Sequence, residues 1–213
     1  MQILEAISES LINGEASETG QLVQKALAEG LSWDTILNDG LFKGMEVVGE
    51  LFKEEEIYVP EVLMAAKAME AGQKILKPLI AGSGSKQELA KVILGTVQGD
   101  MHNLGKSLIA TMLEGAGFEV IDAGEDVSPQ KFVELAASEK AQLIGMSALL
   151  TTTMPYMKTT IEALREAGLA GQVKTIIGGA CVTQRFADEV GADAFAENAG
   201  AAVTEVKRVL GLK

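Results

Sequence analysis

The sequence predicts an α/β protein in two parts, in which a bundle of four helices precedes a doubly wound parallel sheet. Three observations support this prediction. Apolar residues keep helical spacing over about the first eighty residues. A segment rich in glycine and serine follows at Ala81–Ser85 and resembles a linker. Beyond it, short apolar runs alternate with helical stretches, a pattern typical of parallel strands joined by helices.

The first part contains four amphipathic stretches with short connections, so we expect a small helical bundle. The first two stretches cover residues 3–11 and 22–27. The third begins at Trp33, and Ser32 is suited to cap its N-terminus. The fourth begins near Pro60, since proline fits the first turn of a helix.

The second part alternates strands and helices, which implies parallel pairing through right-handed crossovers. The expected strands are 91–97, 118–122, 143–146, 173–177 and 192–196, and the expected helices are 106–115, 129–139, 154–167, one from about 182 and one ending at 210. Five strands and five helices predict a flavodoxin-like (Rossmann-like) doubly wound sheet. The predicted domains are therefore 1–85 for the helical part and 86–213 for the sheet.

Composition excludes several classes of function. The chain has one histidine and one cysteine, so it cannot form a His/Cys zinc site. Its net charge of -12 argues against nucleic-acid binding and fits either docking to protein partners or simply a soluble surface. No apolar run is long enough to span a membrane, and the N-terminus lacks the regions of a signal peptide. We therefore expect a cytoplasmic protein that contacts neither nucleic acid nor membrane.

Ligands of such sheets bind beyond the carboxyl ends of the strands, between the first and third strands in the flavodoxin-like order. The loop after the first strand holds Asp100 and His102, the only histidine. A carboxylate there can accept a hydrogen bond from one ring nitrogen and leave the other for a metal. Gly105 lets a bulky ligand approach the backbone. The alternative is a hydrogen-bonded loop histidine without a special role.

Two further loops lie at the same edge of the predicted sheet. After the third strand, Ser147 and the threonines at 151–153 offer hydroxyls to Asp100 or to a ligand, although a threonine at 152 or 153 could instead cap the next helix. After the fourth strand, Gly178, Gly179 and Ala180 leave room for a flat group, or form an ordinary strand-to-helix turn.

Together these loops resemble the cobalamin-binding domain of small corrinoid proteins from methyltransferase systems, which is related to the cobalamin-binding module of methionine synthase. The family pattern D-x-H-x-x-G, S-x-L, G-G stands here as Asp100-Met101-His102-Asn103-Leu104-Gly105, Ser147-Ala148-Leu149 and Gly178-Gly179. The helical part resembles the family's cap domain through GMEVVGELFKEEEIYVPEVLMAAKAM. The resemblance covers nearly the whole chain.

The resemblance implies a cobalamin or related corrinoid bound with its own base displaced, and His102 as the ligand of cobalt. Asp100 would hold the other ring nitrogen, with Thr153 extending the relay, so His102, Asp100 and Thr153 form the predicted catalytic group. The residues implied to bind the cofactor are Asp100, Met101, His102, Asn103, Gly105, Ser147, Leu149, Thr151, Thr153, Gly178, Gly179, Ala180 and, in the cap, Met45.

The third helix carries three glycines, and two places in the chain depart from the family pattern. Gly40, Gly44 and Gly49 lie in the third helix, where the approach of a macrocycle near Met45 would explain them, or a kink. Cys181 stands where the family often has proline, and residues 197–199 differ from the usual acidic run. Neither departure affects the cobalt site.

The function implied is that of a methyl carrier with little activity alone. Cob(I)alamin would take a methyl group on a substrate:corrinoid methyltransferase and become methylcob(III)alamin. A second enzyme, a corrinoid:thiol or corrinoid:tetrahydrofolate methyltransferase, would remove the methyl group, and a reductive activator protein would restore the cofactor. The expected donor is a methylamine or a methoxylated aromatic compound.

Three alternatives remain at this point. A cobalamin-dependent sensor would share the cap and the pocket, but such proteins usually add a DNA-binding domain, for which no segment is left. A flavodoxin-like electron carrier needs no lone histidine, and aromatic residues are scarce at 4%. A hydrolase could use Asp100 and His102 as an acid–base pair, although only Ser147 offers a nucleophile.

Overall fold

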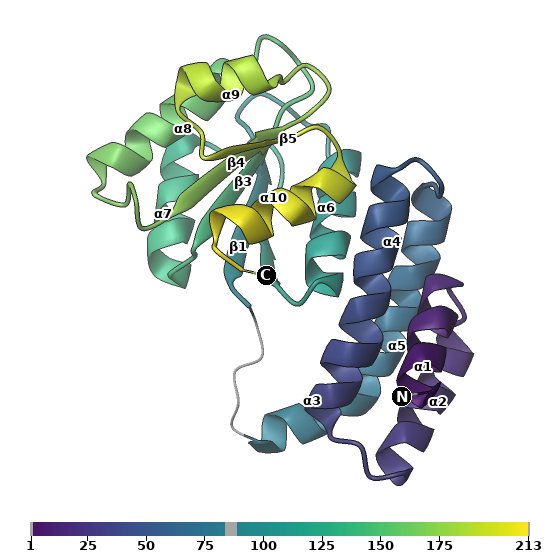
Figure 1. The fold of residues 1–213 in the computed structure, drawn as a ribbon. Coiled ribbons are helices and arrows are strands. Elements are labelled where there is room, and N and C mark those ends of the chain that lie inside the picture. The colour runs from purple at the N-terminus through teal and green to yellow at the C-terminus, as the bar shows by residue number, and fades with distance from the viewer. Residues whose placement is uncertain (1, 84–88, 213) are drawn as a thin grey trace. The chain divides into compact units, whose positions relative to one another are not determined.

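Two compact units make up the computed structural model, which describes residues 2–83 and 89–212 (Figure 1). One unit contains the N-terminal helices together with Gly115–Gly117, and the other contains residues 89–114 and 118–212. Among the described residues, no helix has both the length and the apolar character required to cross a bilayer.

The helical unit confirms the predicted bundle. Its elements are α1 (Gln2–Ile12), α2 (Ala16–Ala28), α3 (Trp33–Thr35), the π-helical segment η1 (Ile36–Phe42), α4 (Lys43–Lys53) and α5 (Val59–Ser83). Because α3, η1 and α4 follow one another without a break, they form the third of the four predicted helices. The side chain of Ser32 accepts a hydrogen bond from the N–H of Thr35, as expected of an N-cap.

Close packing against α1 accounts for two of the three glycines in that third helix. A Cβ atom added to Gly40 would lie 3.1 Å from Cγ2 of Ile7, and one added to Gly44 would lie 3.1 Å from the carbonyl oxygen of Ser8. Both positions therefore need a small residue for the bundle itself. Neither the approach of a macrocycle nor a kink is required to explain them.

The prediction of a linker at Ala81–Ser85 is wrong in its first three residues, because α5 continues through Ser83. Alanine favours a helix, and glycine and serine cost only about 1 kcal/mol or less in one, so these residues do not end it. Gly84 and Ser85 lie outside the described residues.

The second unit confirms the predicted sheet. Its strands are β1 (Lys91–Thr96), β2 (Glu119–Asp122), β3 (Leu143–Ser147), β4 (Lys174–Gly178) and β5 (Ala194–Ala196). Within the described residues they form one parallel sheet in the order β2-β1-β3-β4-β5. The chain moves from β1 to β2 on one side and then crosses back to β3 on the other. The carboxyl ends of β1 and β3 therefore form the switch point where a ligand is expected.

Helices cover both faces of this sheet (Figure 1). They are α6 (Leu104–Gly115), α7 (Pro129–Glu139), α8 (Pro155–Glu166), α9 (Gln184–Val190) and α10 (Ala199–Val209). The face under α7, α8 and α9 is packed by an apolar core that includes Ile93, Ile144, Ile177 and Phe132. The helices α6 and α10 lie across the opposite face. This buried framework holds the strand ends rigidly, so the loops that follow them start from defined positions.

Candidate functional site

The loops after β1 and β3 meet at one buried carboxylate, that of Asp100, whose side chain is fully inaccessible to solvent. Its Oδ1 atom lies 2.7 Å from Nδ1 of His102 and accepts a hydrogen bond from the main-chain N–H of the same residue at 3.1 Å. Its Oδ2 atom accepts hydrogen bonds from the N–H groups of Leu149 at 2.8 Å and Leu150 at 3.2 Å. Thr153 adds a hydroxyl donor at 2.9 Å. Asp100 is thus in direct contact with both His102 and Thr153.

These hydrogen bonds decide the charge of Asp100. Burial by itself raises the pKa of a carboxyl group, because the ionised form loses its hydration. The hydrogen bonds from His102, Leu149 and Thr153 stabilise the ionised form and outweigh burial, so the pKa of Asp100 lies well below its ordinary value. Asp100 is therefore an anion at neutral pH.

An anionic Asp100 fixes the tautomer of His102. An ionised carboxylate can only accept, so the hydrogen of the neutral imidazole ring must lie on Nδ1. The lone pair then lies on Nε2, on the side of the ring that Asp100 does not contact. The His102 side chain is 53% exposed. A half-exposed ring whose Nδ1 is held by Asp100 leaves the Nε2 lone pair available to a ligand, as a metal-binding histidine requires.

The surroundings of His102 are apolar and open. Four large apolar side chains in these two loops are exposed, namely Met101 at 69%, Leu104 at 79%, Leu149 at 43% and Leu150 at 42%. At Gly105, an added Cβ atom would meet no other atom within 4 Å. Exposed apolar side chains of this kind in a small area mark a binding surface. The space and the chemistry fit a broad, largely apolar group lying over His102.

A metal bound at His102 needs its other ligands from elsewhere. No group of three or more His, Cys, Asp or Glu side chains that could hold a metal ion occurs in residues 2–83 and 89–212. A tetrapyrrole macrocycle supplies four nitrogen ligands and leaves an axial position for one imidazole. One exposed histidine fits a metal whose other ligands are supplied by a macrocycle.

The loop after β4 borders the same edge of the sheet. Gly179 has a φ of +127°, and an added Cβ atom there would lie 2.0 Å from the carbonyl oxygen of Ala148. At Gly178 an added Cβ atom would lie 2.8 Å from the carbonyl oxygen of Ala196. Backbone packing alone thus requires both glycines. Gly179 and Ala180 are exposed, and a ligand contact at 178–180 stays a prediction.

The hydroxyls of the β3 loop have different partners. Ser147 lies 3.1 Å from the hydroxyl of Thr96, and Thr151 is exposed. The alternative, in which a threonine at 152 or 153 caps the next helix, does not hold, because the N-cap of α8 is Met154, which forms no side-chain cap hydrogen bond. The Thr153 hydroxyl instead contacts Oδ2 of Asp100 at 2.9 Å and the carbonyl oxygen of Leu150 at 2.8 Å. The hydrolase alternative gains no support, since the Ser147 hydroxyl is bonded to Thr96.

Several residues that support the site escaped sequence analysis. The hydroxyl of Thr96 donates to the carbonyl oxygen of His102 at 2.9 Å. Asp126 accepts a hydrogen bond from the N–H of Gly99 at 2.7 Å and donates its own N–H to the carbonyl oxygen of Asp100 at 3.0 Å. Glu125 accepts a hydrogen bond at 3.0 Å from the side chain of Asn103, which is a predicted site residue. Thr96 could have been noticed in the sequence as a polar residue at the end of the first strand. The contacts made by Asp126 and Glu125, in the loop after β2, had no such signal.

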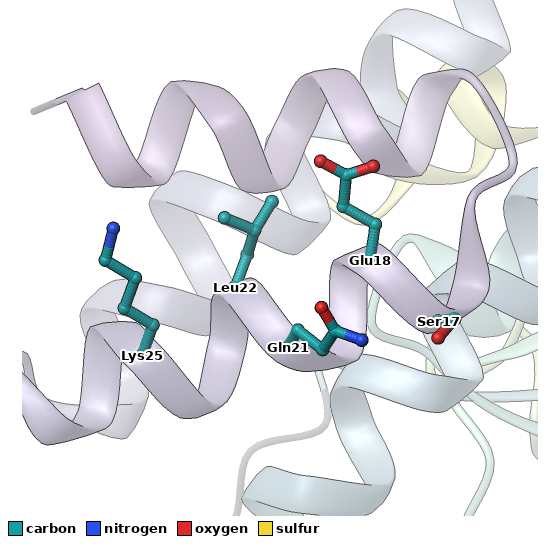
Figure 2. Close-up of a pocket in the computed structure, with 5 residues that line it drawn as sticks. All are labelled: Ser17, Glu18, Gln21, Leu22 and Lys25. Atoms are coloured by element: carbon teal, nitrogen blue, oxygen red, sulfur yellow. The ribbon is translucent and has the colours of Figure 1, made fainter.

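Met45 lies in α4 of the helical unit, where its side chain is 4% exposed, and its contact with a cofactor stays a prediction. Figure 2 shows a hollow on the surface of this unit, lined by Ser17, Glu18, Gln21, Leu22 and Lys25. All five side chains belong to α2, and none is among the predicted site residues.

Comparisons with known proteins agree with this geometry. Models of the B12 binding domain match residues 90–207 and residues 3–77. Dimethylamine corrinoid protein 1 of Methanosarcina acetivorans is 43% identical over 209 residues, which cover 98% of either chain. A cobalamin-binding protein of Desulfitobacterium hafniense has a crystal structure that matches with a TM-score of 0.82 at 31% identity, covering 96% of this chain and 97% of that one.

The methanol:cobalamin methyltransferase complex MtaBC of Methanosarcina barkeri also contains a similar chain. Its crystal structure matches with a TM-score of 0.86 at 27% identity, covering 99% of this chain and 80% of that one.

Proposed function

Since this chain belongs to the family of corrinoid proteins with a B12 binding domain, we propose that it carries methyl groups between two methyltransferases. The observation on which this proposal rests is the Asp100–His102 pair. A buried anion holds Nδ1 of the only histidine and leaves Nε2 available on a half-exposed ring beside exposed apolar side chains. His102 would need this arrangement to bind the cobalt of a corrinoid.

When bound, the corrinoid supplies a cobalt centre that accepts and releases a methyl group. The protein binds, orients and shields this centre. His102 is the proposed cobalt ligand, while Asp100 and Thr153 hold its ring in place. Met101, Asn103 and Gly105 would contact the macrocycle from the first loop. The displaced base of the cofactor and the nucleotide tail that carries it would be bordered by Ser147, Leu149, Thr151, Gly178, Gly179 and Ala180.

The helical unit would serve as the cap over the reactive side of the cofactor, with Met45 facing the macrocycle. We place the boundary of the two domains at residues 85 and 86. The matched segments 3–77 and 90–207 lie on either side of this boundary, which supports the assignment.

The proposed methyl donor is a methylamine, because the relative from M. acetivorans is named a dimethylamine corrinoid protein, and a second relative from the same organism, 40% identical, is named a trimethylamine corrinoid protein. A methoxylated aromatic compound is the second choice. The partners would be a substrate:corrinoid methyltransferase, a corrinoid:thiol or corrinoid:tetrahydrofolate methyltransferase and a reductive activator, all in the cytoplasm. The net charge of -12 suits electrostatic docking of such partners.

Reconstitution tests the cofactor part of this proposal. The protein is refolded with hydroxocobalamin, freed of excess cofactor by gel filtration, and examined by visible spectroscopy and by EPR after reduction to Co(II). Wild type should retain one corrinoid whose EPR signal shows splitting by an imidazole nitrogen. The variant His102→Ala should lose that splitting, whereas Lys158→Ala, an exposed position on α8, should keep it. A wild-type protein that retains no corrinoid would refute the proposal.

Methyl transfer tests the second part. The reconstituted, reduced protein is mixed with a dimethylamine-specific or a trimethylamine-specific methyltransferase and the matching amine. A carrier should become methylated, with a change of the visible spectrum, and should pass the methyl group to a thiol when a second methyltransferase is added. A cobalamin sensor would bind the corrinoid but take no methyl group from either enzyme.

A further inference from the structure

Thr96 is the last residue of β1, and its side chain is fully buried although it is polar. The loop after β2 holds the main chain of this residue on one side, and β3 pairs with it on the other. Its N–H donates to the carbonyl oxygen of Gly124 at 3.0 Å, and its own carbonyl oxygen accepts from Val127 at 3.0 Å. In the register of the sheet it pairs with Ser147 of β3. Its hydroxyl therefore starts from a rigid position at the switch point.

The directions of the hydrogen bonds around Thr96 can be assigned. A carbonyl oxygen cannot donate, so the 2.9 Å contact with His102 uses the single hydroxyl hydrogen of Thr96. The 3.1 Å contact with Ser147 must then use the hydrogen of Ser147. The chain of hydrogen bonds runs from Ser147 through Thr96 to the main chain of His102.

His102 is thus held at separate points by two fixed groups. Asp100 contacts its ring and its N–H, and Thr96 contacts its carbonyl oxygen. Asp100 itself lies on the loop, whereas Thr96 lies on the strand. Among residues 2–83 and 89–212, Thr96 is therefore the strand residue whose side chain ties the carbonyl of His102 to the sheet.

We propose that Thr96 is a positioning residue, which sets the place of His102 relative to the sheet and couples it to the hydroxyl of Ser147. This inference rests on the proposed function, in which the place of His102 determines the bond to cobalt. A ligand atom that accepts the hydrogen of Ser147 would compete with Thr96 for it, so events at Ser147 would be transmitted to the His102 loop.

Amide hydrogen exchange tests the inference without any cofactor. In the apoprotein, Thr96→Val keeps the shape of the side chain and removes the hydroxyl. The bond from Thr96 to the carbonyl oxygen of His102 is then lost. The His102 N–H, which donates to Asp100, should exchange roughly tenfold faster, because opening the loop breaks one hydrogen bond fewer. The core amide of Ile144 should keep its rate, and Thr96→Ser should restore the slow exchange of His102. If Thr96→Val does not fold, Thr96→Ala is measured by the same criteria.

A second readout uses the reconstituted protein. The share of Co(II) showing imidazole splitting in EPR should fall several-fold in Thr96→Val and recover in Thr96→Ser. The inference is overturned if His102 exchanges at the wild-type rate in Thr96→Val, if Ile144 accelerates as much as His102, or if serine fails to restore the wild-type behaviour. Should wild type retain no corrinoid, the proposed function fails, and hydrogen exchange still decides whether Thr96 positions the loop.

Discussion

The hydroxyl of Thr153 donates to Oδ2 of Asp100 at 2.9 Å, although the two residues are 53 positions apart in the chain, and it shares its single hydrogen with the carbonyl oxygen of Leu150 at 2.8 Å. The bond joins the loop after β1 to the loop after β3. It also leaves Oδ1 of Asp100 to His102. The side chain that orients the histidine is therefore itself oriented from the neighbouring strand.

Removing this hydroxyl should weaken both the fold and the site. We expect Thr153→Val to lower the free energy of unfolding by about 1 kcal/mol, because a buried hydrogen bond to a charged group is lost while Leu149 and Leu150 still donate to Asp100. Urea denaturation of the apoprotein measures this change. Thr159→Val, at a hydroxyl on the exposed side of α8, is the control and should cost less. Equal losses in the two variants would contradict the role of Thr153.

Lys106 provides a second test of how the first loop is supported. It lies in the first turn of α6, is 3% exposed, and forms ion pairs with Asp122 at the end of β2 and with Glu125 at 3.6 Å. Lys106→Met should lower the free energy of unfolding by about 1–2 kcal/mol, a value reduced by the partial exposure of Asp122. Lys131→Met, at an exposed pair with Glu134, should change stability by less than about 0.5 kcal/mol. Urea titrations of both variants check these values.

Asp193 should make the fold sensitive to acid. Its burial raises the pKa, but hydrogen bonds from Lys174 and Thr175 outweigh burial and lower the pKa below the ordinary value of 3.8. A carboxyl group whose pKa is lower in the folded state stabilises the protein at pH values above its unfolded-state pKa. This contribution is lost as the pH falls toward the folded-state pKa. The free energy of unfolding of Asp193→Asn should therefore depend less on pH than that of wild type below about pH 4. Parallel curves for the two proteins would exclude this contribution.

Gly179 is expected to tolerate no side chain. Its φ of +127° and the carbonyl oxygen of Ala148 leave no room for a Cβ atom. Gly179→Ala should lower the free energy of unfolding by about 3 kcal/mol or more, in the upper range for single substitutions. Gly168 also has a positive φ of +71° but open space around it, so Gly168→Ala should cost only about 1 kcal/mol. Thermal unfolding of both variants separates the two costs. Gly168→Ala measures the strain of a positive φ alone, and Gly179→Ala adds the steric clash with Ala148.

Gly105 should behave in the opposite way. An added Cβ atom meets no protein atom within 4 Å, so the apoprotein of Gly105→Ala should be at least as stable as wild type. If a macrocycle lies over this turn, the same methyl group should reduce retention of hydroxocobalamin in gel filtration. Retention equal to that of wild type would place the macrocycle elsewhere.

Local patterns carried most of the fold prediction. Helical spacing in the first part and the alternation of apolar runs with helices in the second were sufficient for the bundle and the five strands. Boundaries in the sheet part differ by two residues or fewer, whereas α2 begins six residues before the predicted stretch 22–27. Ala81–Ser83 were assigned to a linker because glycine and serine often mark loops. The helix continues there because these residues weaken a helix only slightly.

Residue types alone predicted the site only where its residues are adjacent in the chain. The sequence by itself determined that Asp100 and His102 share a short loop at a switch point, because strand order in doubly wound sheets follows general rules. The sequence left the hydroxyl partner of Asp100 open by residue types alone, although its resemblance to the corrinoid family pointed to Thr153, which lies 2.9 Å from Asp100. It also did not reveal the bonds of Thr96, Asp126 and Lys106. Those contacts join residues from different strands, and they exist only once β1 lies hydrogen-bonded between β2 and β3 and fixes the distances between their loops.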